Sequence, residues 1–190
     1  MTGSARTALA LCALLLGGCP EGGAGTKKRS DAVASPAGAE GPSLYTRAAL
    51  TDAVSAIRGR VGDADVLSFE LAPDRATIQV QLSTDPHRVV QYEWKNGRVF
   101  GPAPVQLRGT GDLDANLFPL SAVDFSALPE LAKTAVQRVD ADHGTVERIL
   151  IRRNLPADEA IGVRVYVDSP IRDGHLDADS RGRVVENGKL

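Results

Sequence analysis

Apolar residues recur with the spacing of an α-helix in two separate stretches of the chain. In the first stretch they fall at positions i, i+3, i+4, i+7 and i+11, namely Leu50, Ala53, Val54, Ile57 and Val61. The second stretch follows Ser126, a residue type that caps helix N-termini, and consists of Leu128, Leu131, Ala132, Ala135, Val136 and Val139. A stripe with this period covers one side of a helix. The pattern therefore predicts helices over about 44–60 and from 126 onward.

After each helix the period changes to two, which is typical of strands with one buried face. In the first half the alternating segments are "VLSFEL" (66–71), "ATIQVQL" (76–82), "VVQYEW" (89–94) and the short "RVF" (98–100). In the second half they are "TVERILIRR" (145–153), "AIGVRVYV" (160–167), "IRDGHLDAD" (171–179) and "VVE" (184–186). Asn96-Gly97 is a strong hairpin signal, because both positions tolerate a positive φ.

The two halves align in order and in apolar phase. "LTDAVSAIRGRV" (50–61) matches "LPELAKTAVQRV" (128–139), and "NGRVF" (96–100) matches "RGRVV" (181–185). The predicted fold class is α+β, with two tandem repeats at 44–100 and 126–190, each one helix packed on a four-stranded antiparallel sheet. The connector at 101–125 is too apolar for a linker, so we expect it to pack across both repeats and join them into one body.

The N-terminal segment has the pattern of a secretory signal peptide. Arg6 is followed by the apolar run "TALALCALLL" (7–16) and by small residues. A helix of this length spans about 15 Å, half the thickness of a bilayer core. The pattern therefore predicts a cleaved signal peptide at 1–18 rather than a membrane-spanning helix. Residues 20–43 have no period and few large apolar groups, so that 19–43 is predicted to be a disordered tether beginning with Cys19.

Leu16, Gly17, Gly18 and Cys19 resemble a bacterial lipobox. That resemblance implies that signal peptidase II cuts between Gly18 and Cys19 and that Cys19 carries acyl chains such as palmitate. More than one such chain anchors a protein stably. Pro20 stands where lipoproteins retained in the inner membrane typically have Asp, so the resemblance favours an outer-membrane anchor facing the periplasm, without excluding the inner membrane.

The closing segment "GHLDADSRGRVVE" (174–186) joins an acidic strand, a Gly turn and a valine strand. Together with the helix-and-strands plan over about 44–100 and 126–187, it resembles the PepSY-like and β-lactamase-inhibitor-like group of small secreted bacterial domains. That resemblance implies a non-enzymatic periplasmic module that binds, inhibits or escorts other proteins. No functional residue of the group can be assigned to a position of this chain.

The numbers of charged residues and of cysteines exclude a class of partner and a kind of cross-link. The chain has 22 Lys and Arg against 24 Asp and Glu, a formal net charge of −2; loss of Arg6 with the signal peptide leaves 21 against 24, or −3. Proteins that bind nucleic acids carry a concentrated basic face, so no nucleic-acid partner is expected. Cleavage also removes Cys12, so the mature fold has to stand without an intramolecular disulfide.

No catalytic or metal-binding motif is complete. Three acidic loops, at 112–116, 140–144 and 177–182, place oxygen ligands at alternate positions, but each fails at a required position of a calcium loop. His87, His143 and His175 lack metal-ligand spacing, and no nucleophile elbow, phosphate loop or dinucleotide motif occurs in the sequence. We therefore expect no catalytic residue, no metal and no cofactor.

Aromatic residues make up only 4% of the chain, yet Tyr92 and Trp94 share one strand face. Two interpretations of this pair stay open. The side chains are either core residues beneath the first helix or an exposed pair that marks a possible interaction site.

Taken together, these patterns predict a membrane-anchored, non-catalytic envelope lipoprotein that acts as a protein-binding, inhibitory or scaffold module. Its expected partners are the lipid bilayer, through the N-terminal acyl chains, and an envelope protein; the sequence predicts no oligomeric state. The alternative is a carrier of a small apolar ligand or a cryptic envelope hydrolase. An empty apolar cavity between the repeats would favour the carrier, and a flat exposed sheet with Tyr and Arg side chains would favour the binding module.

Overall fold

The computed structural model describes residues 43–108, 111–157 and 159–186. Every described residue belongs to one compact unit within Ala37–Leu190. The predicted signal peptide, the cleavage site between Gly18 and Cys19, and the predicted tether up to residue 42 lie outside the described residues.

The described chain forms a helix with four strands, a connector, and a second helix with three strands. The first group is α1 (Arg47–Val61), β1 (Asp65–Leu71), β2 (Arg75–Leu82), β3 (Asp85–Lys95) and β4 (Arg98–Val105). The connector contains α2 (Leu113–Asn116), β5 (Phe118–Pro119) and two 3₁₀ turns, η1 (Leu120–Ala122) and η2 (Phe125–Ala127). The second group is α3 (Leu128–Val139), β6 (Thr145–Arg153), β7 (Ile161–Asp168) and β8 (Gly174–Asp179).

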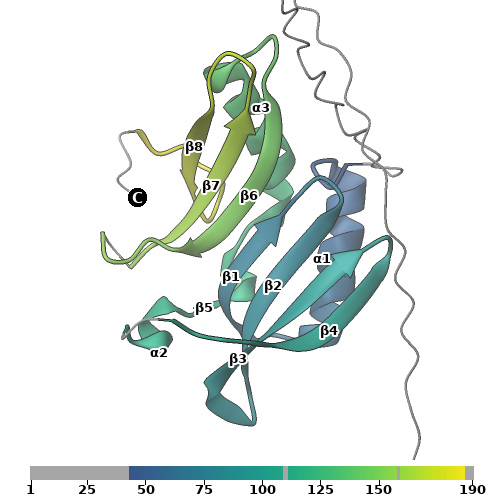
Figure 1. The fold of residues 1–190 in the computed structure, drawn as a ribbon, viewed down its shortest axis with the longest axis vertical. Coiled ribbons are helices and arrows are strands. Elements are labelled where there is room, and N and C mark those ends of the chain that lie inside the picture. The colour runs from purple at the N-terminus through teal and green to yellow at the C-terminus, as the bar shows by residue number, and fades with distance from the viewer. Residues whose placement is uncertain (1–42, 109–110, 158, 187–190) are drawn as a thin grey trace, which may run out of the picture. The chain divides into compact units, whose positions relative to one another are not determined.

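All of these strands belong to one antiparallel sheet, in the order β4-β3-β2-β1-β6-β7-β8, with β5 paired to β1 (Figure 1). The prediction of two tandem repeats with separate four-stranded sheets is therefore wrong. The halves join where β1 pairs with β6, through Phe69↔Ile151, Glu70↔Leu150 and Leu71↔Ile149. Two separate sheets would each expose an edge of unpaired backbone groups, and pairing those edges satisfies both. Apolar alternation along a strand shows which of its faces is buried, but it does not show which other strand pairs with it.

Two further predictions fail in the second half. The segment "VVE" forms no fourth strand and contributes only an isolated bridge, Ala178↔Val184. Ser126 does not cap the second helix but lies in η2, where its backbone N–H and its hydroxyl donate to the carboxylate of Asp124. α3 begins two residues later, at Leu128, and tolerates Pro129 in its first turn.

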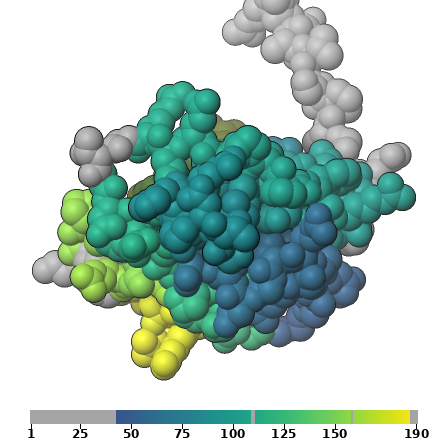
Figure 2. Space-filling view, turned by 90° about the horizontal axis from the view of Figure 1, so that it is seen from below, coloured from purple at the N-terminus to yellow at the C-terminus, as the bar shows by residue number. Residues whose placement is uncertain are grey.

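Helices α1 and α3 lie on the same face of the sheet. Figure 1 shows both helices behind the strands, and Figure 2 shows α1 (blue) on one side of the teal strands of the first half. Most of the strand residues that point toward the helices are buried, and they form one hydrophobic cluster with both helices. At its centre, Phe69 of β1 meets the ring of Phe125 edge-on, with 5.0 Å between centroids. A single core therefore serves both halves.

The connector contributes to this core only in its second part. The buried residues of this part are Leu117, Phe118, Leu120, Val123 and Phe125. In its first part, β4 continues past residue 100 to Val105, and Leu107 is 45% exposed. The apolar residues of the connector thus divide between a packed segment and an exposed one.

One hydroxyl group spans the junction of the two halves. Oη of Tyr45 donates toward the carbonyl oxygens of Leu71 in β1, at 3.4 Å, and of Glu147 in β6, at 3.1 Å. Burial, together with the nearby carboxylate of Glu147, raises the pKa of Tyr45, so the hydroxyl keeps its proton at neutral pH. Elsewhere along β6, Nε of Arg153 donates to the carbonyl oxygen of Leu117 at 2.9 Å.

We expect Tyr45→Phe to lower the free energy of unfolding by about 1 kcal/mol, because the two carbonyl groups at the junction lose their shared donor. Tyr92→Phe is the matched control, since Tyr92 is also half-buried but its hydroxyl has no hydrogen-bond partner among the described residues; its expected effect is below about 0.5 kcal/mol. Urea denaturation measures both variants. Equal losses in the two would contradict the bridging role of Tyr45.

Candidate functional site

The face of the sheet opposite the helices carries an ordered set of charged side chains over β6, β7 and β8. Directly opposed residues form three rows across these strands: Arg148, Tyr166 and His175; Leu150, Arg164 and Asp177; Arg152, Gly162 and Asp179. The residues between them along each strand point to the core and are buried, so these nine residues share the uncovered face. We refer to the nine as the arginine face.

In the first row an aromatic ring holds a guanidinium group in place. Cζ of Arg148 lies 4.4 Å from the centroid of the Tyr166 ring, and the ring of His175 lies 6.3 Å from Tyr166 on the other side. Nε of Arg148 is buried and has no hydrogen-bond partner among the described residues. A cation over an aromatic face gains about 0.5–2 kcal/mol. Arg148 is thus ordered before any partner arrives.

The second row holds an ion pair. Nε and Nη2 of Arg164 donate to the two carboxylate oxygens of Asp177, at 2.6 and 2.9 Å. These hydrogen bonds raise the pKa of Arg164 above its already high ordinary value. Nε2 of His175 lies 3.8 Å from the same carboxylate. The charge of Arg164 is therefore compensated within the fold.

The third row leaves Arg152 exposed. Its cross-strand neighbour Gly162 has no side chain, and a hollow of about 60 Å³ lies there between side chains of all three strands. Asp179, at the end of the row, is bonded to Arg183 at 2.6 Å. None of the ion pairs within the described part of the chain includes Arg148 or Arg152. The arginine face thus carries two uncompensated positive charges, both on β6.

Sequence reasoning did not predict the arginine face, although a signal was present. In "ERILIRR" (147–153) Arg148 and Arg152 take polar positions of the alternation. Alternation alone assigns such residues to solvent. The pairing of β6 with β7, which sets Tyr166 beside one arginine and Gly162 beside the other, cannot be read from the alternation of either strand.

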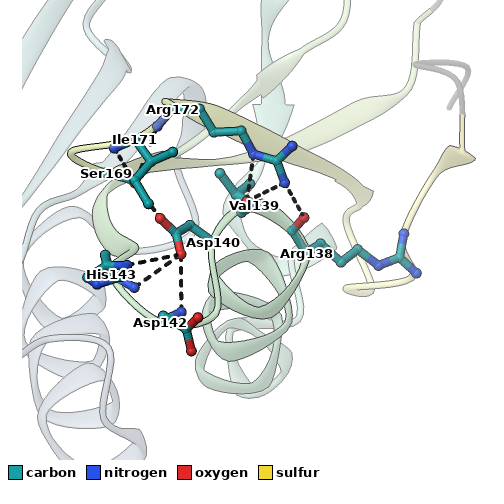
Figure 3. Close-up of polar contacts among 8 residues, drawn as sticks. All are labelled: Arg138, Val139, Asp140, Asp142, His143, Ser169, Ile171 and Arg172. Carbon is teal, nitrogen blue, oxygen red and sulfur yellow. Dashed lines mark hydrogen bonds and ion pairs between the residues drawn. The ribbon is translucent and has the colours of Figure 1, made fainter.

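A second polar cluster lies where α3 ends (Figure 3). The carboxylate of Asp140 accepts a hydrogen bond from Oγ of Ser169 at 2.6 Å and from two backbone N–H groups of the following turn at 3.1 Å. Nε of Arg172 donates to the carbonyl oxygen of Val139 at 2.8 Å, at the C-terminus of the helix. The cluster ties the end of α3 to the loop between β7 and β8.

Asp140, His143 and Ser169 are the residue types of a hydrolytic triad, but their arrangement does not fit one. A catalytic histidine lies between the serine and the carboxylate, where it takes the serine proton. Here Asp140 bonds Ser169 directly, and Nδ1 of His143 lies 3.7 Å from Asp140. Oγ of Ser169 also accepts the backbone N–H groups of Ile171 and Arg172. The arrangement is that of a helix end and a turn held together.

The acidic loops of the sequence serve as turns. Asp112 accepts the N–H of Asp114 at the start of α2, and Asp179 accepts the N–H groups of Arg181 and Arg183. Asp140 has the same role after α3. In the described part of the chain, no group of three or more His, Cys, Asp or Glu side chains is placed to hold a metal ion.

Tyr92 and Trp94 lie on the helix side of the sheet. They pair with Ile78 and Ala76 of β2, which are fully buried. Both aromatic side chains are half-buried and pack against the core cluster, and Cζ of Arg60 lies 5.9 Å from the centroid of the Tyr92 ring. This packing is that of residues at the margin of the core, and an interaction role for the pair stays a prediction.

A groove of about 390 Å³ lies between α1 and η2. Leu50, Val54 and Phe125 are among its lining residues, and each is less than 9% exposed. Arg58 reaches over the Phe125 ring, with Cζ 5.5 Å from its centroid. The groove is open to solvent rather than enclosed, and these core side chains expose little of their surface. It offers a small apolar ligand little surface to bury.

No helix among the described residues is long and apolar enough to cross a membrane. No family model matches the chain, and no curated protein matches it. Among solved structures, the chain is similar to a "putative lipoprotein" from Clostridium difficile 630, with 15% sequence identity, a TM-score of 0.47, and coverage of 72% of this chain and 90% of that one. A similarity of this size assigns the chain neither a family nor a function.

We expect Ser169→Ala to raise the pKa of Asp140, because the hydrogen bond from Ser169 is the main cause that lowers it. A carboxyl group whose pKa is lowered in the folded state stabilises the fold at pH values above its pKa in the unfolded state, about 3.9. That stabilisation is lost as the pH falls through the pKa of the folded state. When the pH is lowered from 7 into the acid range, the free energy of unfolding should therefore fall less for the variant than for the wild type. Carboxyl-carbon NMR titration measures the pKa, with Ser83→Ala in an exposed turn as control. An unchanged pKa would contradict this account of the cluster.

Proposed function

We propose that the protein is a lipid-anchored, non-catalytic module of the bacterial cell envelope that binds another envelope protein through the arginine face. One observation carries the proposal. An uncovered sheet surface combines a ring-stacked Arg148, a bidentate Arg164–Asp177 pair and an exposed Arg152.

The composition and the order of this face favour a protein partner. Tyr and Arg are enriched in protein–protein interfaces and dominate the binding energy at their hot spots. Arg148 and Arg164 are already held by contacts within the fold, so binding costs little further side-chain entropy. The hollow of about 60 Å³ beside Gly162 is far smaller than the roughly 300–1,000 Å³ of small-molecule pockets. The face is therefore better suited to a protein surface than to a small ligand.

The anchoring part of the proposal rests on the sequence that ends at Cys19. In this proposal, acyl chains on Cys19 hold the module at a membrane of the envelope, and the outer membrane is favoured because Pro20 follows the cysteine. Two or more chains bind a bilayer stably, whereas one binds it only marginally. The partner is then a protein at or near the same membrane.

We expect Cys19→Ala to move the protein from the membrane fraction to the soluble fraction, because no acyl chain can be attached without the thiol. Cys12→Ala is the matched control: it removes the other cysteine of the chain, which precedes the predicted cleavage site, and should leave the protein in the membrane. Cell fractionation and immunoblotting measure both. A Cys19→Ala protein that stays in the membrane rules out this anchor.

We expect a photo-crosslinking residue at position 175, on the arginine face, to capture a partner protein in cells. His175 is half-exposed, so the probe fits there without disturbing the core. The same probe at position 52, exposed on α1, is the control and should capture nothing. Mass spectrometry of the adducts identifies the partner. Adducts from position 52 but none from position 175 would show that the interaction surface lies on the helices instead.

A further inference from the structure

The structure also indicates which chemistry the partner presents. We propose that the arginine face takes an extended acidic segment of the partner protein, in which two carboxylates stand four residues apart and flank one apolar residue. This inference rests on the proposed function, because it describes the partner bound at the same face.

The spacing follows from β6. Arg148, Leu150 and Arg152 are alternate residues of this strand and share its uncovered face. With a rise of about 3.3 Å per residue, the two arginines stand about 13 Å apart, with the leucine midway. An extended partner segment has the same rise, so its residues i, i+2 and i+4 lie over these three side chains in turn. The hollow beside Gly162 adjoins Leu150 and has room for part of the central apolar side chain.

The charge pattern determines where the segment lies. The row that contains Leu150 runs from β3 to β8 as Glu93, Thr77, Glu70, Leu150, Arg164 and Asp177. The carboxylate of Glu70 therefore borders β6 on one side, and on the other side the neighbour is Arg164, whose charge is compensated by Asp177 of β8. The two uncompensated charges of the arginine face both lie on β6, whereas Arg98, another exposed arginine, lies on β4 at the far edge of the sheet. An acidic segment gains most electrostatic energy when it runs along that strand.

A protein segment fits this pattern better than an anionic membrane surface does. A bilayer presents a continuous plane of negative charge and attracts polybasic surfaces. Glu70 and Glu93 belong to the same uncovered face as the arginines, so a membrane would meet these carboxylates together with the guanidinium groups. A narrow segment aligned with β6 contacts Arg148 and Arg152 and leaves the carboxylates in water.

Two peptides of equal composition test the spacing, with the full-length protein purified from membranes in detergent. The peptide TTETVTETT places its glutamates four residues apart around a valine, and TTVTTEETT places them side by side. Fluorescence anisotropy should give a Kd at least about tenfold lower for the first peptide, equivalent to about 1.4 kcal/mol. Arg152→Glu should weaken its binding at least about tenfold, and Arg152→Gln should weaken it less. Arg88→Glu, the same charge reversal at an exposed position of β3, should leave it unchanged.

Equal affinity for the two peptides, or equal effects of Arg152→Glu and Arg88→Glu, would overturn the inference. Binding to phosphatidylglycerol vesicles in preference to either peptide, lost in Arg152→Glu, would also overturn it, because the face would then recognise lipid. The crosslinking experiment at position 175 tests the proposed function separately. Crosslinks without peptide discrimination reject the acidic segment alone, whereas missing crosslinks reject the proposed function itself.

Discussion

The pairing of β1 with β6 is the interaction on which the rest of the structure depends. It consists of three residue pairs, and the hydroxyl of Tyr45 bridges the same two strands beyond the last of them. Because the sheet continues across this pairing, Phe69 and Ile151 are direct neighbours, and both helices cover one shared core. Two separate halves would each bury a smaller fraction of their surface and be less stable for that reason. They would also expose two strand edges that the pairing now satisfies.

The same pairing produces the candidate interaction surface. A continuous sheet with its helices on one side leaves its other side to solvent or to a partner. Joining β1 to β6 sets Glu70 beside Leu150, so that the positive charges of β6 lie between carboxylates of both halves. Within the second half, the Arg148–Tyr166 stack and the Arg164–Asp177 pair keep the side chains ordered. The Asp140 cluster holds α3 to the loop between β7 and β8, the strands that display Arg164, Tyr166 and Asp177.

The sequence predicted most of the elements but not their assembly. Helical periodicity predicted both helices to within a few residues of their observed positions, 47–61 and 128–139, because an apolar stripe is a local property of a helix. Strand alternation likewise predicted most of the buried strand residues, but not at the bulge in β1, where Val66 is buried instead of Leu67. The choice of a neighbouring strand is a long-range property, so the merged sheet and the Arg148–Tyr166 contact escaped prediction. Ser126 failed as a helix cap because Asp124, two residues earlier, makes the competing turn.

One measurement tests the joined sheet most directly. Trp94 in β3 is the single tryptophan of the chain, so its fluorescence reports the unfolding of the first half, while hydrogen exchange of the β7 amides at 161–168 reports the second half. If the β1–β6 pairing makes one cooperative unit, the two signals share one midpoint across a guanidinium titration. Protection of the β7 amides that persists after the Trp94 transition is complete would contradict this account, because the halves would then be independent.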